Sequence, residues 1–267
     1  MLFHKPLFVK SLRDHLRGII GWTSGIIAIV IIQLGVYPTI RDSSAGWAAV
    51  ADSFPDAFKE IFRMTDYTSE AGYLSTELLS FVVPFIFIGL GCSWGARLAT
   101  EDEESGAADI ALGLPISRSS YLVSRMASAL CVVGTAGAAF FVTLIIGARL
   151  LEMSISLRRF AIASLTLTVL SILMLCLAVV LGSWSGRRSV ALGISMATAI
   201  AMFIVYSLAP LVDFLDPTTA FNPFQWTIGS QPLTRGLDEA YTFWAVIVSA
   251  ALFASSFSLF ERRDIAG

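Results

Sequence analysis

Long apolar stretches alternate with charged segments along the 267 residues of the chain. Six stretches contain no Asp, Glu, Lys or Arg, and all 18 basic and 20 acidic residues lie outside them. Each stretch has about the 20 residues that a helix needs to cross the hydrocarbon core of a bilayer. A charge at the centre of such a helix would cost about 2.5 to 3.5 kcal/mol on insertion. The uncharged stretches are 18–38, 78–96, 126–148, 160–186, 189–212 and 240–260.

This pattern predicts an all-α membrane protein, with six transmembrane helices in a single domain over residues 1–267. A soluble helix bundle does not fit, because soluble helices average about 11 to 12 residues and keep a polar face. The first stretch is no cleavable signal peptide, since no small-residue cleavage site precedes Tyr37 and Pro38. The predicted spans are about 18–38, 77–97, 126–148, 160–184, 189–211 and 240–260.

The segment before the first span has apolar residues at helical spacing and basic residues between them. It predicts an amphipathic helix on the membrane surface, and the alternative is an ordinary basic flank. Basic residues favour the cytoplasmic side of a membrane, and most of the 18 fall on the side of the N-terminus, so both termini are expected to be cytoplasmic. The apolar positions are Phe8, Leu12, Leu16 and Ile19, and the basic ones include Lys10, Arg13 and Arg17.

Two segments on the other side are too polar to span the membrane. In 39–76, aromatic and aliphatic residues recur at helical intervals, which predicts short interfacial helices interrupted at Pro55. The second segment, 213–239, contains the sequence FNPFQW at 221–226. Its aromatic residues fit the belt at a membrane–water interface.

Three pentapeptides have the GxxxG spacing that lets helix backbones approach closely in a membrane. They are GWTSG, GCSWG and GSWSG, and they fall near predicted span ends. Pro84 predicts a kink in the second span. The candidate packing glycines are Gly21, Gly25, Gly91, Gly95, Gly182 and Gly186.

The loop between spans two and three, residues 99–125, is the most informative polar segment. It opens with the four acids 101–104 and continues as a short apolar helix that Pro115 ends. Ser117 caps the next predicted helix, which carries Arg125 into the third span. A short helix held between two spans suits docking of a soluble partner, because a rigid element transmits motion. The alternative is a solvated acidic loop.

The order of these features resembles the type-two (ABC-2) family of ABC exporter membrane subunits. The acidic cluster is followed by Gly106, a short helix, the LPISR turn at 114–118 and an arginine before the next span. The AGYLSTE stretch at 71–77 and the ending FERRDIAG at 260–267 support the resemblance. Ala107 stands where that family has threonine.

The resemblance implies a half-transporter that exports an apolar or amphipathic substrate such as a drug, antibiotic, peptide or lipid-like molecule. A second permease chain and two copies of a separate P-loop ATPase would complete it in a prokaryotic cell membrane, with ATP and Mg on the ATPase. The N-terminal helix with Lys10, Arg13 and Arg17 would be the interface helix. The coupling helix and ATPase contacts would comprise Glu101, Glu103, Glu104, Gly106, Leu112, Leu114, Pro115, Ser117 and Arg118.

The chain itself is not expected to be an enzyme or to bind a cofactor. A P-loop needs a lysine after glycine, and none of Lys5, Lys10 and Lys59 follows one. GCSWG matches a serine-nucleophile pattern, but serine catalysis needs a nearby base, and the two histidines, His4 and His15, lie outside every span. Neither they nor the three cysteines have metal-ligand spacing. The net charge of −2 gives no basis for binding nucleic acid.

Two other functions stay open from the residues. One is a secondary transporter or channel, although such carriers usually keep ionisable groups inside the membrane. Glu77 and Asp213 lie at predicted outer edges, where a solvated flank is the expected role. The other is a membrane interaction protein that transports nothing.

Overall fold

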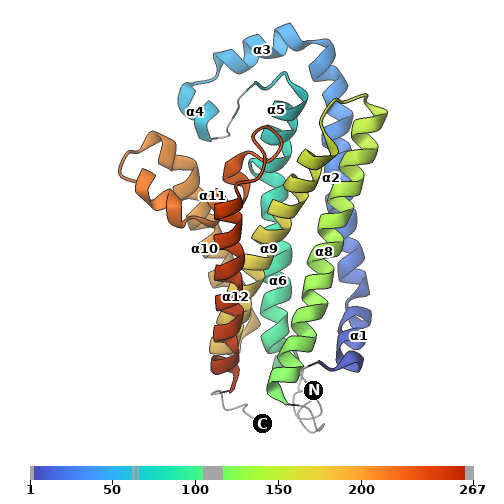
Figure 1. The fold of residues 1–267 in the computed structure, drawn as a ribbon, viewed down its shortest axis with the longest axis vertical. Helices are drawn as coiled ribbons and strands as arrows, with labels where there is room; N and C mark the ends of the chain where they lie inside the picture. Colours follow the sequence, from blue (N-terminus) through green and yellow to red (C-terminus); the bar gives the residue numbers. More distant parts are fainter. Residues whose placement is uncertain (1–2, 62–63, 65, 105–116, 262–267) are drawn as a thin grey trace.

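The computed structural model describes residues 3–61, 64, 66–104 and 117–261 (Figure 1). Within these ranges every regular element is a helix, which confirms the all-α prediction. Six helical segments are long and apolar enough to cross a membrane, in the predicted order. They are Leu16–Asp42, Glu70–Glu101, Ser119–Leu150, Leu157–Ser185, Arg188–Leu211 and Glu239–Phe260.

Most of these segments extend beyond the uncharged stretches, because a helix continues into the polar layer after its apolar part ends. The α-helices are α1 Lys5–Asp14, α2 Leu16–Asp42, α3 Ser44–Ser53, α4 Asp56–Ile61, α5 Glu70–Leu74, α6 Val82–Glu104, α8 Arg118–Leu150, α9 Leu157–Ser185, α10 Arg188–Leu208, α11 Pro223–Thr227 and α12 Glu239–Glu261. A π-helix covers Ser75–Leu79, and 3-10 turns cover Ala209–Leu211, Asp216–Phe221 and Ile228–Ser230.

Helix α9 is the centre of the bundle. It packs against α6, α8, α10 and α12, and Figure 1 shows it running between them. Apolar side chains occupy all of its faces, and most of them are buried. In a bilayer such a helix is held by close packing and interhelical hydrogen bonds rather than by escape from water.

The contact between α6 and α9 depends on three of the predicted packing glycines. A Cβ added to Gly91 would overlap the carbonyl oxygen of Ser171, and one added to Gly95 would overlap that of Leu175. A Cβ on Gly182 would lie 3.0 Å from the Cβ of Ala99. The Ser171 hydroxyl also donates to the carbonyl oxygen of Phe87 across this contact, at 2.7 Å. The two helices therefore approach at backbone distance.

The other three candidate glycines have different surroundings. Gly21 and Gly25 face outward from α2, where an added Cβ would meet no atom of the described residues within 4 Å, so they make no packing contact with that part of the chain. Gly186 ends α9 with a φ of 67°, the left-handed conformation that glycine adopts at helix ends. Two close contacts outside the GxxxG pattern are those of Gly137 with Thr168 and of Gly147 with Leu34.

The bundle has two distinct ends. At the loop end, α6 finishes at Glu104 and α8 begins at Arg118, and the start of α1 and the end of α12 lie there too (Figure 1). At the opposite end lie the short helices α3, α4, α5 and α11. The segment 39–76 thus forms the short helices that its sequence predicts, and 213–239 contains short helices as well.

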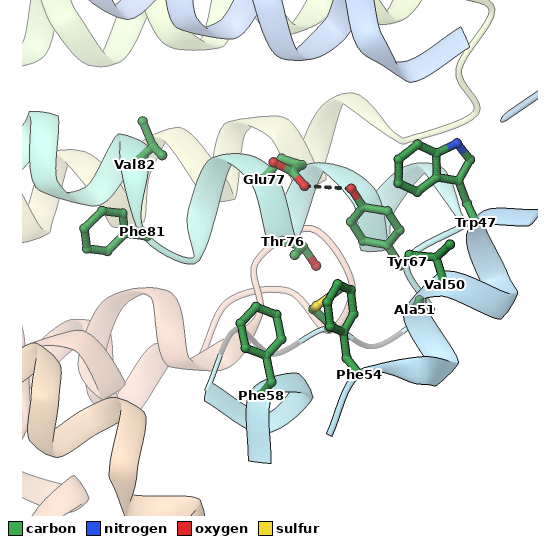
Figure 2. Close-up of a pocket in the computed structure, with 11 residues that line it drawn as sticks. Trp47, Val50, Ala51, Phe54, Phe58, Tyr67, Thr76, Glu77, Phe81 and Val82 are labelled. Atoms are coloured by element: carbon green, nitrogen blue, oxygen red, sulfur yellow. Dashed lines mark hydrogen bonds between the residues drawn. The ribbon is translucent and has the colours of Figure 1, made fainter. Parts of the chain in front are cut away.

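Helices α3 and α4 fold back over the start of the second span and cover a cavity of about 340 Å³ (Figure 2). Phe54 is the C-cap of α3, and Pro55 separates it from α4, as the sequence predicts. Tyr67, in the connection to α5, points into this space.

The second span is irregular on the N-terminal side of Pro84. The segment Ser75–Leu79 is a π-helix, and regular α-helix resumes at Val82. Proline lacks an N–H, and its ring displaces the carbonyl group four residues earlier, which is Ser80 here. The expected kink is therefore a break in the helical pattern one turn before the proline.

Candidate functional site

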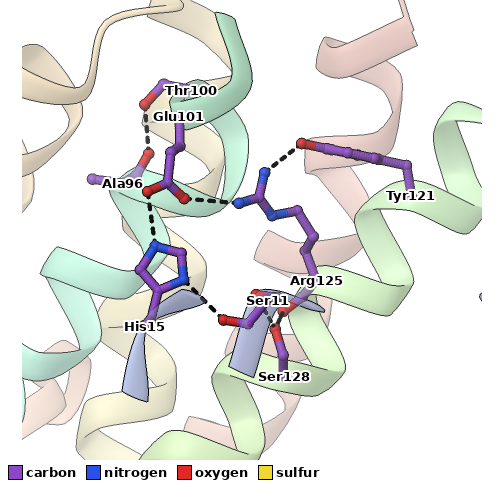
Figure 3. Close-up of polar contacts among 8 residues, drawn as sticks. All are labelled: Ser11, His15, Ala96, Thr100, Glu101, Tyr121, Arg125 and Ser128. Atoms are coloured by element: carbon purple, nitrogen blue, oxygen red, sulfur yellow. Dashed lines mark hydrogen bonds and ion pairs between the residues drawn. The ribbon is translucent and has the colours of Figure 1, made fainter. Parts of the chain in front are cut away.

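An ion-pair network joins three helices at the loop end. The Glu101 carboxylate on α6 accepts from Nε2 of His15 at 2.8 Å and from Nη2 of Arg125 at 2.8 Å (Figure 3). Arg125 also donates to the Tyr121 hydroxyl. His15 is the residue between α1 and α2, and Arg125 lies on α8. We call Glu101, His15, Arg125 and Tyr121 the loop-end network.

The surroundings of His15 favour its protonated form. Nδ1 lies 2.8 Å from the carbonyl oxygen of Ser11, and Nε2 lies against Glu101. Both neighbours are acceptors, so only a doubly protonated ring donates to both. The hydrogen bond to Glu101 is the largest influence and raises the pKa of His15 above its ordinary value, although partial burial opposes the shift.

Serines join α1 to α8 beside this network. The backbone N–H of His4 donates to the Ser124 hydroxyl at 2.7 Å, and the Ser11 and Ser128 hydroxyls lie 2.9 Å apart. Ser124 and Ser128 are one turn apart on α8, so they present one face to α1. The N-terminal helix is therefore held against the third span.

Ser117 caps the start of α8, as the sequence predicts. Its side chain accepts from the backbone N–H of Ser120 at 3.2 Å, which is an N-cap hydrogen bond. Arg118 is the first residue of α8, and Glu103 and Glu104 end α6. Both borders of the loop are thus helical.

The structure describes some of the other predicted contact residues and not others. Both oxygens of Glu101 are engaged inside the chain, by His15 and Arg125. Lys10, Arg13 and Arg17 are exposed on the N-terminal helices, as an interface helix requires. Four predicted coupling-helix residues lie outside the described residues, namely Gly106, Leu112, Leu114 and Pro115.

The sequence predicted no role for His15, which lies outside every span and so offers no catalytic base there. A signal was present in the four-residue spacing of Ser11 and His15 and of Tyr121 and Arg125, which places each pair on one helix face. The pairing with Glu101 across 86 residues has no local signal. Among the described residues no group of three or more His, Cys, Asp or Glu side chains could hold a metal ion.

The architecture agrees with the comparison to known protein families. The family model described as multidrug efflux system permease Rv1217c, C-terminal domain, matches residues 9–261. The chain belongs to this family. A membrane permease of the multidrug efflux class accounts for the six apolar helices and is consistent with an ABC-type permease. No curated protein matches the chain.

In this efflux permease, the loop-end network connects three helices. A half-buried carboxylate between two cations holds its partners in one geometry, because separation would leave charges unpaired in a poorly solvated place. The side chains of His15 and Arg125 are only 13% and 10% exposed, against 30% for Glu101. A displacement of one of the three helices at this level is therefore passed to the others.

Proposed function

We propose that the chain is the membrane subunit of an ATP-driven ABC exporter of the ABC-2 type, which moves an apolar or amphipathic substrate out of a prokaryotic cell. The loop end faces the cytoplasm, together with both termini. A P-loop ATPase in two copies supplies the energy, and a second permease chain completes the transport path. ATP and Mg are bound by the ATPase.

The loop-end network is the observation that carries this proposal. The loop between Glu104 and Arg118 connects the two spans that Glu101 and Arg125 join. An ATPase that docks on this loop moves both spans and, through His15, the N-terminal helix as well. If no ion pairs joined these helices, the loop could move without moving the two spans.

The placement of charges at the loop end supports docking there. Lys10, Arg13 and Arg17 are exposed beside α8, and the acids that follow Glu101 end α6. A partner surface with both signs of charge would be oriented by these two groups, since electrostatic complementarity fixes the register of an interface.

One observation favours an ion-coupled carrier as a second candidate. Glu77 lies within the helical segment Glu70–Glu101 that contains the second span, directly before its uncharged stretch, and is half-exposed. Ion-coupled carriers place ionisable groups inside the membrane to bind the coupling ion. The Glu77 carboxylate lies near one end of the span rather than at its middle, which suits an ion pathway less well.

Co-purification tests the exporter proposal. The tagged chain, extracted from its native membrane, is expected to retain a P-loop ATPase, and Leu114→Asp with Arg118→Asp should abolish this association while membrane insertion persists. Phe214→Asp is the matched control, because Phe214 is 83% exposed in a segment at the opposite end. Recovery of the intact chain with no ATPase, or full association in the double variant, would contradict the proposal.

A further inference from the structure

The cavity at the opposite end has a composition that predicts its ligand. Its volume of about 340 Å³ is in the range of small-molecule pockets, roughly 300 to 1,000 Å³. It lies between α3 and α4 on one side and the start of the second span on the other (Figure 2). The described lining is mainly aromatic and aliphatic, and includes Trp47, Val50, Phe54, Phe58, Tyr67 and Phe81.

Glu77 supplies the single carboxylate of the described lining. Its Oε1 accepts from the Tyr67 hydroxyl at 2.7 Å, and its Oε2 accepts from Nε2 of Gln33 at 3.4 Å. Burial and the hydrogen bond to Glu77 raise the pKa of Tyr67, so this hydroxyl keeps its proton and donates. Both partners orient the carboxylate, and neither carries a charge.

No basic side chain is among the described residues that line this cavity. The described lysine of the covering helices, Lys59, is directed elsewhere: its ammonium group donates to the carbonyl oxygen of Asp52 at 3.1 Å and lies 3.7 Å from the Asp56 carboxylate. The charge of Glu77 is thus not balanced by the described lining. A carboxylate beside apolar walls attracts a cation more strongly than one in water does.

The aromatic residues add a second preference for positive charge. The rings of Trp47 and Tyr67 have centroids 6.5 Å apart, and those of Phe54 and Phe58 are stacked at 4.9 Å. Ring faces attract cations through their quadrupole, and an organic cation loses less hydration than an inorganic ion when it contacts them. The walls also bury the apolar body of such a ligand.

We propose that this cavity binds a lipophilic organic cation of single charge, held by the Glu77 carboxylate and by the aromatic rings of α3, α4 and Tyr67. The claim that a cation binds here rests on the cavity and its lining. The claim that such cations are the exported substrate class rests on the proposed function. At the end opposite the ATPase-docking loop, the site lies where a substrate leaves the permease.

Equilibrium binding of tetraphenylphosphonium to the purified full chain tests the site. Tetraphenylborate has the same shape and the opposite charge, and it should bind at least about tenfold more weakly. Glu77→Gln should weaken tetraphenylphosphonium binding by about tenfold or more. Phe54→Ala should weaken it by about threefold, through a lost ring contact. Asp213→Asn is the matched control, since Asp213 is an exposed acid outside the cavity, and it should bind as the unaltered chain does.

Equal binding of the two probes would overturn the site, as would unaltered affinity in Glu77→Gln. Elution volume and unfolding temperature show whether each variant is folded. If Glu77→Gln does not fold, unaltered affinity in Phe54→Ala overturns the site. The exporter proposal can fail separately from the site. Charge-selective binding to a chain that has no ATPase partner would support the cavity site and contradict the exporter proposal. ATP-driven efflux together with unaltered binding in Glu77→Gln would support the exporter proposal and contradict the site.

Discussion

Two glutamates of one membrane-spanning segment are used in opposite ways. Glu101 at the loop end is neutralised inside the chain, because Arg125 and His15 each contact one of its oxygens at 2.8 Å. Among the described residues, the hydrogen-bond donors to Glu77 at the opposite end are the neutral groups of Tyr67 and Gln33. The comparison shows that a carboxylate near a membrane has no fixed role. Its partners decide whether it braces helices or remains available to a cation.

The largest expected effect on stability comes from the contact between α6 and α9. A leucine at Gly95 would overlap the backbone of Leu175 and push α6 from α9. Overpacking of this kind costs about 3 kcal/mol, so Gly95→Leu should strongly lower the unfolding temperature. Gly25→Leu is the control, since Gly25 faces open space. Similar thermal scans for both variants would disprove the close approach of α6 and α9.

Removal of each glutamate charge tests the comparison itself. Glu101→Gln leaves Arg125 and His15 facing each other without a counter-charge, which should cost about 2 kcal/mol of unfolding free energy. Glu77→Gln keeps an oxygen for the Tyr67 hydroxyl, so its cost should stay below about 1 kcal/mol. Chemical unfolding in detergent measures both. A larger loss for Glu77→Gln than for Glu101→Gln would reverse the two assignments.

The smallest expected effect is a pH dependence at the loop end. Because the folded chain raises the pKa of His15, protonation of this ring stabilises the fold. The stabilisation is complete below the ordinary histidine pKa of about 6.5 and is lost as the pH rises through the higher folded value. Glu101 raises the pKa of His15 most strongly, the Ser11 carbonyl also raises it, and the charge of Arg97 lowers it. Arg125 pairs with the other oxygen of the same Glu101 carboxylate.

Unfolding temperatures from pH 6 to pH 9 measure this effect. The unaltered chain should lose stability at the alkaline end, and His15→Asn should lose the part of that dependence which His15 contributes. His4→Asn is the control, as a substitution of the other histidine. An identical pH profile in His15→Asn and the unaltered chain would refute a charged role for this ring.

The six spans could be predicted from the sequence because the hydrocarbon core of a bilayer excludes charged side chains. The uncharged stretches located all six spans, and Pro55 and Ser117 marked a helix break and a cap because their chemistry is local. The GxxxG spacing found Gly91, Gly95 and Gly182 at close contacts, but it also selected Gly21 and Gly25. Spacing identifies a face of small residues without showing which neighbour lies against it.

The polar site was harder to predict because its partners are distant in the chain. Glu101 pairs with His15 across 86 residues and with Arg125 across 24. Glu77 was interpreted as a solvated flank because it borders an apolar stretch. The structure adds what the sequence could not show: α3 and α4 fold back near Glu77, and the half-exposed carboxylate lines the cavity between them and the second span. The helical spacing of apolar residues predicted that these helices form, and only their packing shows what they cover.

ATP-driven accumulation of tetraphenylphosphonium in inside-out membrane vesicles tests the central claim most directly. The vesicles contain the permease and its co-purifying ATPase, and a protonophore is present throughout so that no membrane potential distributes the cation. We predict accumulation that requires ATP and is lost when Leu114→Asp is combined with Arg118→Asp. A second set of vesicles, without the protonophore, receives an imposed proton gradient. Uptake that is independent of ATP in the first set and driven by the proton gradient in the second would contradict an ATP-driven exporter.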